Sequence, residues 1–306
     1  IAATNNLEYV KKQADIAARE AIAVGANLAF APVVDIDKNF RNPIMNTRTY
    51  GNDANFVKEA GTVFVKKIQQ EGIAASPKHF PGDGVDERDQ HLLSSVNDLS
   101  CEEWDETYGE IYKSVIEAGT KSIMVGHIMQ PAYTKKINPE IRDEEIMPAS
   151  LSKEIMQGLL RKKLGFNGLI LTDASTMSGM CIPMRRRDAV PAAIAAGADM
   201  FLFCKNTEED IKYMMEGYKK GIITAERLDE AVLRILGVKA SLRLYEKKLI
   251  PIYENAVSVI GCEEHKKIEK ECADKAVTLV KNKQDILPLS PEKTKRMLLY
   301  PLKMPG

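Results

Sequence analysis

Short apolar runs alternate with longer segments of mixed polarity along the first 247 residues. The apolar runs are too short for helices and predict buried strands, which we place at 27–34, 73–76, 121–127, 168–173 and 199–204. The longer segments repeat apolar positions with helical spacing and predict helices at 5–24, 53–71, 101–118, 149–163, 188–196, 207–219 and 224–242. Strands that alternate with helices are typical of βα units, so we expect an α/β fold around a parallel sheet.

The densest group of polar side chains directly follows the predicted strand at 73–76. It is the stretch from Lys78 to His91, with the sequence KHFPGDGVDERDQH. The proline at 81 and the glycines at 82 and 84 exclude regular structure, so this stretch is expected to be a loop at the exit of a strand. Loops held by a rigid scaffold often carry binding and catalytic residues, and this loop therefore indicates a site.

Within this loop, Asp89 and His91 are two residues apart, so their side chains point the same way in extended backbone. A carboxylate beside an imidazole fixes its tautomer and raises its basicity, as proton transfer requires. Two other interpretations are a solvated charged loop and a cation site of Asp83, Asp86, Asp89 and His91. The loop lacks the spacing of a calcium loop and a second histidine at i+4, so we expect no metal.

A second candidate residue is Asp173, which ends the predicted strand at 168–173. Parallel α/β folds place their active groups at the carboxyl ends of strands. Asp173 is therefore either a catalytic nucleophile or a cap of the helix that follows, which is common at strand-to-helix turns. The proton-transfer pair in the other loop favours the nucleophile, because the two would complete one catalytic site.

The spacing Lys-His-Phe-Pro-Gly-x-Gly-x4-Asp-x-His resembles the signature of the β-N-acetylhexosaminidase branch of glycoside hydrolase family 3. The resemblance implies that Asp89 and His91 form the general acid/base and that Lys78 and His79 hold the sugar. One residue departs from the family pattern: Asp83 stands between the two glycines, where histidine is usual. This departure concerns a local contact of the loop rather than the acid/base pair.

Other segments resemble the same family. The stretch 172–177 resembles its Ser/Thr-Asp nucleophile motif with a following methionine, which implies that Asp173 is the nucleophile and Met177 a substrate contact. The stretches 27–37 and 41–51 resemble the family's run from Ala-Pro-Val-x-Asp to Arg-Ser-Phe-Gly, which implies that Arg48 touches the sugar and that Asp35 is its partner. The alternative for Arg48 is a buried ion pair. His127, at the end of another strand, lines the pocket in this interpretation or is a hydrogen-bonded structural residue.

The family resemblance also implies the architecture. Residues 1–247 would form a (β/α)8 barrel of the TIM type, of which about five of the eight βα units are present. Residues 248–306 would form a linker and the beginning of a second α/β domain, with its first strand at 298–300. The chain starts at Ile1 and has no Asp-x-Glu-Gly-Gly stretch before residue 27, so we expect an incomplete catalyst that is poorly soluble, oligomeric or inactive alone.

The chemistry implied by the resemblance is that of a retaining exo-glycosidase acting on terminal β-linked N-acetylglucosamine. Asp173 would form the covalent glycosyl-enzyme, and His91, held by Asp89, would act first as acid and then as base. A phosphorylase, a β-glucosidase of the same family and a non-catalytic sugar-binding remnant are the alternatives. The aglycone, whether peptidoglycan, chitin or a host glycan, stays open, and peptidoglycan recycling is the first physiological context to consider.

Composition narrows the class of partner. The 43 basic and 43 acidic side chains balance, which gives no sign of nucleic acid or of a charged membrane surface. No apolar run is long enough to span a membrane. The five cysteines (101, 181, 204, 262 and 272) are far apart and favour a reduced, cytoplasmic protein. We expect a small-molecule glycoside or oligosaccharide as substrate, no cofactor, and an oligomeric state that the sequence leaves undetermined.

Overall fold

The structure is a computed structural model that describes residues 1–246, 251–283 and 286–298. Its strands are β1 (Leu28–Ala29), β2 (Ala74–Ala75), β3 (Ser95–Val96), β4 (Ser122–Val125), β5 (Ile128–Met129), β6 (Leu169–Ala174) and β7 (Met200–Leu202). Its α-helices are α1 (Leu7–Ala23), α2 (Ala54–Gln70), α3 (Cys101–Trp104), α4 (Glu110–Glu117), α5 (Pro131–Ile137), α6 (Ser178–Cys181), α7 (Arg186–Ala196), α8 (Thr207–Lys219), α9 (Ala225–Ser241), α10 (Tyr253–Val259) and α11 (Glu263–Ala276).

Shorter helical segments complete the chain. Four are 3-10 helices: η1 (Ala2–Thr4), η2 (Asn46–Arg48), η4 (Asp143–Glu145) and η5 (Ala149–Leu151). Two are π-helical: η3 (Asp105–Gly109), which joins α3 to α4, and η6 (Glu154–Lys163). The helix expected over 101–118 is therefore continuous but contains a π segment, and the helix expected over 149–163 is divided in two.

All the pairs of strands are parallel, and β1, β2, β4, β6 and β7 lie side by side in chain order, while β3 and β5 form a separate pair. β1 pairs with β2, and β4, β6 and β7 form a second ladder. The two ladders are joined beyond the end of β2, where the Phe80 N–H donates to the Met124 carbonyl oxygen at 2.9 Å. Within the described ranges no ladder joins β1 to β7, so these strands form an open array. The α/β class is confirmed, while closure into a barrel stays a prediction.

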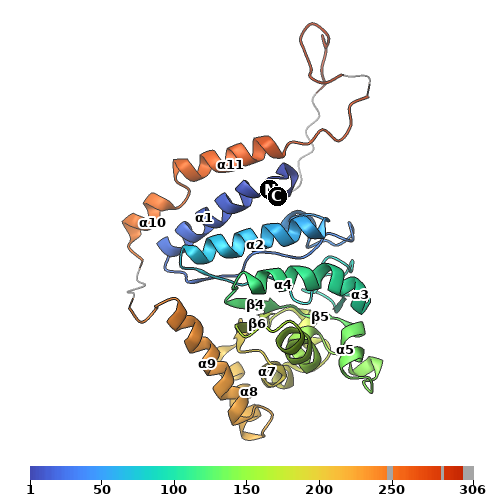
Figure 1. Ribbon diagram of the computed structural model, residues 1–306, viewed down its shortest axis with the longest axis vertical. Coiled ribbons are helices and arrows are strands. Elements are labelled where there is room, and N and C mark those ends of the chain that lie inside the picture. The colour runs from blue at the N-terminus through green and yellow to red at the C-terminus, as the bar shows by residue number, and fades with distance from the viewer. Residues whose placement is uncertain (247–250, 284–285, 299–306) are drawn as a thin grey trace.

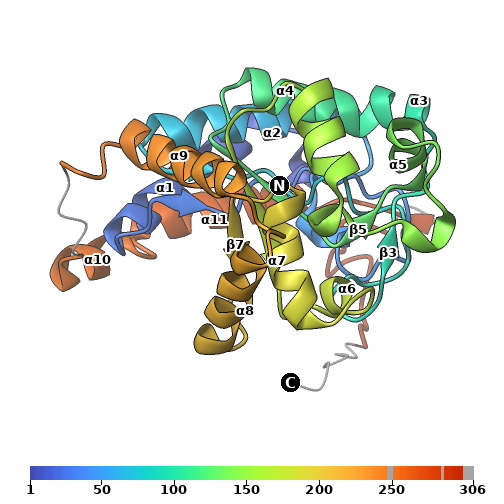
Figure 2. The same ribbon diagram turned by 90° about the horizontal axis from the view of Figure 1, so that it is seen from below.

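Helices cover both sides of this array. Figure 1 shows α11, α1, α2 and α4 stacked in successive layers on one side of the strands. Figure 2 shows α7, α8 and α9 gathered on the other side. Helix α2 lies close to the segment that follows β1 at Gly61, where an added Cβ would lie 2.8 Å from a methyl group of Val34. Only glycine therefore lets α2 approach the end of the first strand this closely.

Aromatic side chains form the part of the core beneath the loop at 78–91. The Phe80 ring packs edge-on against Tyr112, with 4.8 Å between ring centroids, and also against Trp104. The indole N–H of Trp104 donates to the Pro81 carbonyl oxygen at 2.7 Å. These contacts bury the first half of the loop and hold its main chain in place, although its sequence is rich in glycine and proline.

All five strands and seven helices expected from the sequence are present, and every expected strand except β6 is shorter than expected. The small parallel pair β3–β5 and the short helices α5 and α6 were not anticipated. The charged stretch at 252–276 forms α10 and α11, and no strand follows in 277–283 or 286–298. Most of the strand expected at 298–300 lies outside the described residues, so a second domain stays a prediction. Among the described helices, none is long and apolar enough to cross a membrane.

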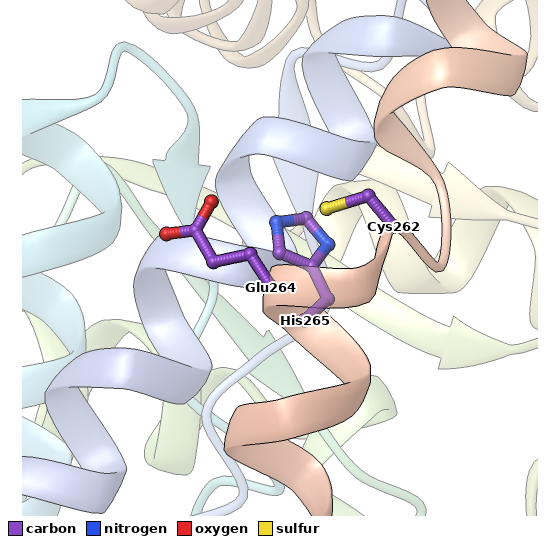
Figure 3. A group of neighbouring side chains, drawn as sticks. All are labelled: Cys262, Glu264 and His265. Carbon is purple, nitrogen blue, oxygen red and sulfur yellow. The ribbon is translucent and has the colours of Figure 1, made fainter.

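His265 is only 4% exposed, although it lies in the charged helix α11. Figure 3 shows it beside Cys262 and Glu264, with donor atoms within 4.8 Å of one another. Two ion pairs with α1 account for this group. Arg19 donates to Glu264 at 3.1 Å, and His265 Nδ1 lies 2.7 Å from Glu20. Because the guanidinium of Arg19 would repel a cation here, we assign the group to the α1–α11 contact.

A buried charge cluster closes the amino-terminal end of β6 and β7. The Asp199 carboxylate accepts from the guanidinium groups of Arg161 (2.7 Å), Arg227 and Arg234 (3.3 Å). It also accepts from the Ile170 N–H at 2.9 Å. One carboxylate thus joins η6, α9 and the two strands, and without it three cations would face one another.

We therefore expect Asp199→Asn to lower the free energy of unfolding by about 3–5 kcal/mol, because it leaves buried guanidinium groups without their counter-ion. Urea unfolding followed by circular dichroism measures the change. Asp143→Asn is the matched control, since Asp143 pairs with Lys135 but is 80% exposed. A loss at Asp199 no larger than that at Asp143 would show that the cluster does not hold these elements together.

Candidate active site

The site begins with Asp35, a completely buried carboxylate just after the first strand. Its Oδ1 accepts from the Asp83 N–H at 2.7 Å and from the His79 N–H at 3.1 Å. Its Oδ2 lies 2.7 Å from Nδ1 of His79. We assign a ring proton to Nδ1, because the group that faces it is a carboxylate. Asp35 therefore fixes both the main chain and the ring of His79.

His79 connects Asp35 to Asp173. Its Nε2 lies 3.7 Å from Oδ2 of Asp173, and the side chain is 4% exposed. Asp173 is the last residue but one of β6, and its side chain is 16% exposed. Its Oδ1 accepts from the Ala174 N–H at 2.7 Å. Burial raises the pKa of Asp173, but the charges of His79, His127 and Lys78 and this hydrogen bond together hold it below its ordinary value. Asp173 is thus kept ionised, as a nucleophile must be.

Lys78 and Arg48 bring positive charge to the same strand ends. Burial lowers the pKa of Lys78; the charge of Arg48 lowers it further, and those of Asp173 and Asp35 oppose the shift. Arg48 is exposed and lines a cavity of about 290 Å³ with Pro32 and Val33. The expected pairing of Asp35 with Arg48 is wrong, because the hydrogen bonds of Asp35 go to His79 and Asp83. The buried ion pair considered for Arg48 is excluded by its exposure.

The proton-transfer pair is formed as expected. Nδ1 of His91 lies 2.6 Å from Oδ1 of Asp89, which also accepts the His91 N–H at 2.8 Å. The His91 side chain is 48% exposed and that of Asp89 is 18% exposed. This geometry leaves Nε2 of His91 as the nitrogen available to a ligand. The pair can therefore give and take a proton at a solvent-accessible position.

The alternative of a shared cation site in this loop is not favoured. Asp86 accepts from the Arg88 side chain at 2.8 Å and from the Val96 N–H at 2.8 Å. Asp83 accepts instead from the side-chain amides of Asn42 and Gln90, and Asp89 is bonded to His91. Each carboxylate thus has its own donors, and they do not converge on one point.

The loop is docked onto the chain that follows Asp173. The Ser178 N–H donates to the His91 carbonyl oxygen at 3.0 Å, and the Gly179 N–H to that of Gln90 at 3.1 Å. At Gly179 an added Cβ would lie 2.7 Å from the same Gln90 oxygen. A glycine is therefore required at 179 for the two loops to meet, and this contact brings the Asp89–His91 pair to the end of the array that carries Asp173.

His127 and Met177 complete the expected set. Both ring nitrogens of His127 are bonded within the protein: Nδ1 lies 2.7 Å from the Ser150 hydroxyl and Nε2 lies 3.0 Å from the Ala174 carbonyl oxygen. Burial lowers the pKa of His127 despite the opposing charge of Asp173. These contacts favour the structural interpretation of His127. Met177 is 4% exposed and precedes α6, next to the docked loop.

Gln90 and Asn42 were not anticipated as parts of the site. Both are 1% exposed, and both donate to Asp83. Apart from the unusual aspartate at 83, the sequence offers no signal for them, because their partners are distant along the chain or are main-chain groups. The structure brings together Lys78, His79, Asp35, Asp173 and the Asp89–His91 loop.

Comparison with known proteins identifies this arrangement. The model of the family described as "Glycosyl hydrolase family 3 N terminal domain" matches residues 1–238. A β-N-acetylglucosaminidase/β-glucosidase of Cellulomonas fimi is 50% identical over 306 residues, covering 100% of this chain and 54% of the relative. The chain thus spans about half the length of the curated relatives it matches.

Solved structures agree with this match. A β-glucoside phosphorylase, BglX, bound to 2FGlc superposes with a TM-score of 0.92 at 50% identity, covering 96% of this chain and 53% of that one. A glycoside hydrolase family 3 β-N-acetylglucosaminidase from Paenibacillus sp. str. FPU-7 superposes with a TM-score of 0.80 at 28% identity, covering 91% and 52%.

The charge of Lys78 gives a testable pH dependence. Asp173 has a depressed pKa, so its ionised form is present above that pKa and is lost as the pH falls through it. Lys78→Met removes one of the charges that depress it, and the acid limb of kcat/KM should move to higher pH. The position of the limb is independent of any loss of rate. Lys66→Met, on an exposed part of α2, is the control and should leave the limb in place. An unmoved limb in Lys78→Met would separate Lys78 from the nucleophile.

Proposed function

The chain belongs to glycosyl hydrolase family 3, and on that premise we propose that it carries the catalytic residues of an enzyme that cleaves terminal β-linked N-acetylglucosamine with retention of configuration. The observation that supports this most is the docking of the Asp89–His91 pair onto the segment that follows Asp173. An ionised carboxylate and an exposed imidazole held by a second carboxylate are what a two-step displacement needs.

In the first step, Asp173 attacks the anomeric carbon and forms a glycosyl ester, while His91 donates its Nε2 proton to the departing oxygen. In the second step, His91 removes a proton from the incoming acceptor, whose oxygen displaces Asp173. Asp89 keeps the other ring nitrogen bonded and stabilises the imidazolium. An imidazole titrates near pH 6.5 without perturbation, so one group can serve as acid and base near neutrality.

The preference for N-acetylglucosamine is supported by two comparisons. The relative from Cellulomonas fimi and the Paenibacillus structure are both described as β-N-acetylglucosaminidases. The first is also described as a β-glucosidase, so glucose is the natural competing substrate. Lys78, His79 and Arg48 are the residues we propose to contact the sugar, while Asp35 acts on the sugar only through His79.

A phosphorylase is the second candidate, in which inorganic phosphate replaces water as the acceptor. Two observations favour it: the acid/base is an imidazole rather than a carboxylate, and Lys78 and Arg48 lie at the same strand ends. An anionic acceptor is repelled less by an imidazole than by a carboxylate, and the two cations attract it. The solved structure at 50% identity is described as a β-glucoside phosphorylase.

One assay separates these functions. The protein that carries this chain is incubated with aryl β-N-acetylglucosaminide or aryl β-glucoside, with and without phosphate, and the sugar product is identified by NMR. We expect faster release from the N-acetylglucosaminide; a sugar 1-phosphate would assign the second candidate, and faster release from the glucoside would make this a β-glucosidase. Asp173→Asn, which keeps the shape of the side chain, should abolish turnover. No release from either substrate would favour a sugar-binding remnant.

The role of His91 predicts a dependence on the leaving group. His91→Ala should lose about a hundredfold or more in kcat/KM on alkyl glycosides, whose leaving oxygen needs a proton. It should lose much less on dinitrophenyl glycosides, which depart unprotonated. Asp89→Asn should show the same pattern with a smaller loss, since Asp89 orients the ring without transferring a proton. Equal losses on all leaving groups would make His91 a structural residue.

A further inference from the structure

Asp83 is a buried carboxylate for which the reaction above has no use. It is 2% exposed and lies in the same loop as the acid/base pair. Its Oδ1 accepts from the Asn42 side-chain amide at 3.0 Å and from the Gly84 N–H at 2.6 Å. Its Oδ2 accepts from the Gln90 side-chain amide at 2.9 Å. Both oxygens of Asp83 therefore face donors.

The orientation of the two amides is fixed from their far sides. The side-chain Oδ1 of Asn42 accepts the N–H groups of Ile44 (2.9 Å) and Met45 (2.8 Å). The side-chain Oε1 of Gln90 accepts the His127 N–H at 2.8 Å. Neither amide can turn over without setting its NH2 group against a main-chain N–H. Their NH2 groups must therefore point at Asp83, which needs to be an acceptor on both oxygens.

Gln90 is the residue between Asp89 and His91. Its side chain reaches inward to Asp83, and its carbonyl oxygen accepts the Gly179 N–H from the segment after Asp173. The side chains of its two neighbours point toward solvent instead, 18% and 48% exposed. The middle of the catalytic motif is thus held from both sides, and Asp83 is the only charged group in that attachment.

We propose that Asp83 is a positioning residue that locks the acid/base loop against the nucleophile's segment through Gln90. This inference rests on the proposed role of His91 in proton transfer. Asp83 itself lies too deep to touch substrate, and it acts by fixing where the ring of His91 stands. The hydrogen bond that Asn42 donates to the Asp83 carboxylate, and the one that the Asp83 N–H donates to Asp35, hold Asp83 against the segment that follows the first strand. The contacts of Asp83 with Asn42 and Gln90, which we call the lock, therefore connect the acid/base loop to that segment.

The lock is expected to open in mild acid. The titratable groups facing Asp83 are Asp35, His79 and the Tyr108 hydroxyl, which donates to the Asp83 carbonyl oxygen. Burial and the charge of Asp35 raise the pKa of Asp83 to about 6, against the opposing effects of His79 and two hydrogen bonds. A proton on either carboxylate oxygen of Asp83 would point at an N–H donor, and the hydrogen bond made there would be lost. Because the folded pKa exceeds the ordinary value of about 3.9, the folded state takes up this proton first, and the lock fails while the fold survives.

The test exchanges acceptor and donor between the two side chains. Asp83→Asn sets an NH2 group against a donor, and Gln90→Glu sets two carboxylates against each other; each should lower kcat/KM on an alkyl glycoside by about tenfold or more. The double variant restores every hydrogen bond, because Glu at 90 accepts from both Asn at 83 and the His127 N–H. Its rate should return to within about threefold of the wild type. Glu87→Gln, an exposed carboxylate of the same loop, is the control.

Two readouts distinguish positioning from general damage. Losses in the single variants should be small on dinitrophenyl glycosides, as for His91→Ala, and should vanish when His91 is already alanine. Hydrogen exchange of residues 84–94 should rise in the single variants and return in the double variant, whichever sugar the enzyme cleaves. Unchanged exchange and rate in Asp83→Asn would overturn the lock. An inactive wild type with the expected exchange pattern would overturn the proposed function and leave the lock in place.

Discussion

The site depends on one buried carboxylate, that of Asp35, which accepts the main-chain N–H groups of His79 and Asp83 and the ring N–H of His79. These bonds tie the exit of the first strand to the exit of the second. A buried carboxylate is unfavourable unless donors surround it, and here the donors come from the loop that carries the chemistry. Because the loop supplies the donors that the charge needs, its path is set by the scaffold and its first half is rigid.

Glycine makes this path possible at two positions of the loop. Gly82 and Gly84 both have positive φ, and an added Cβ would collide with the Tyr108 ring at the first and with the Ile36 carbonyl oxygen at the second. The motif Pro-Gly-x-Gly is therefore a packing requirement as well as a turn. It lets the chain reverse against the end of the first strand, so that Asp83 points inward while Glu87, Arg88 and His91 are exposed.

The sequence was sufficient for the strand ends and for the placement of the polar side chains beside them, since both follow local rules. Asp173, Lys78 and the Asp89–His91 pair were predictable because parallel strands gather their carboxyl ends and because a spacing of two places side chains together. The partner of Asp35 was not predictable: the pairing with Arg48 was inferred from the family resemblance, whereas the structure places the main-chain and ring N–H groups of His79 against Asp35. The roles of Asn42, Gln90 and Gly179 depend on main-chain groups of distant segments, which no residue pattern reveals.

The lock also explains what an aspartate at position 83 requires of the rest of the chain, since the resembled family usually has histidine there. A neutral imidazole has one acceptor nitrogen, and its other nitrogen is a donor. It could not accept from Asn42 and Gln90 together while both are oriented by main-chain N–H groups from behind. With histidine at 83, an acceptor would be needed at 42 or at 90. The aspartate and the two amides therefore form one unit, in which a change at any of the three positions calls for a compensating change at another.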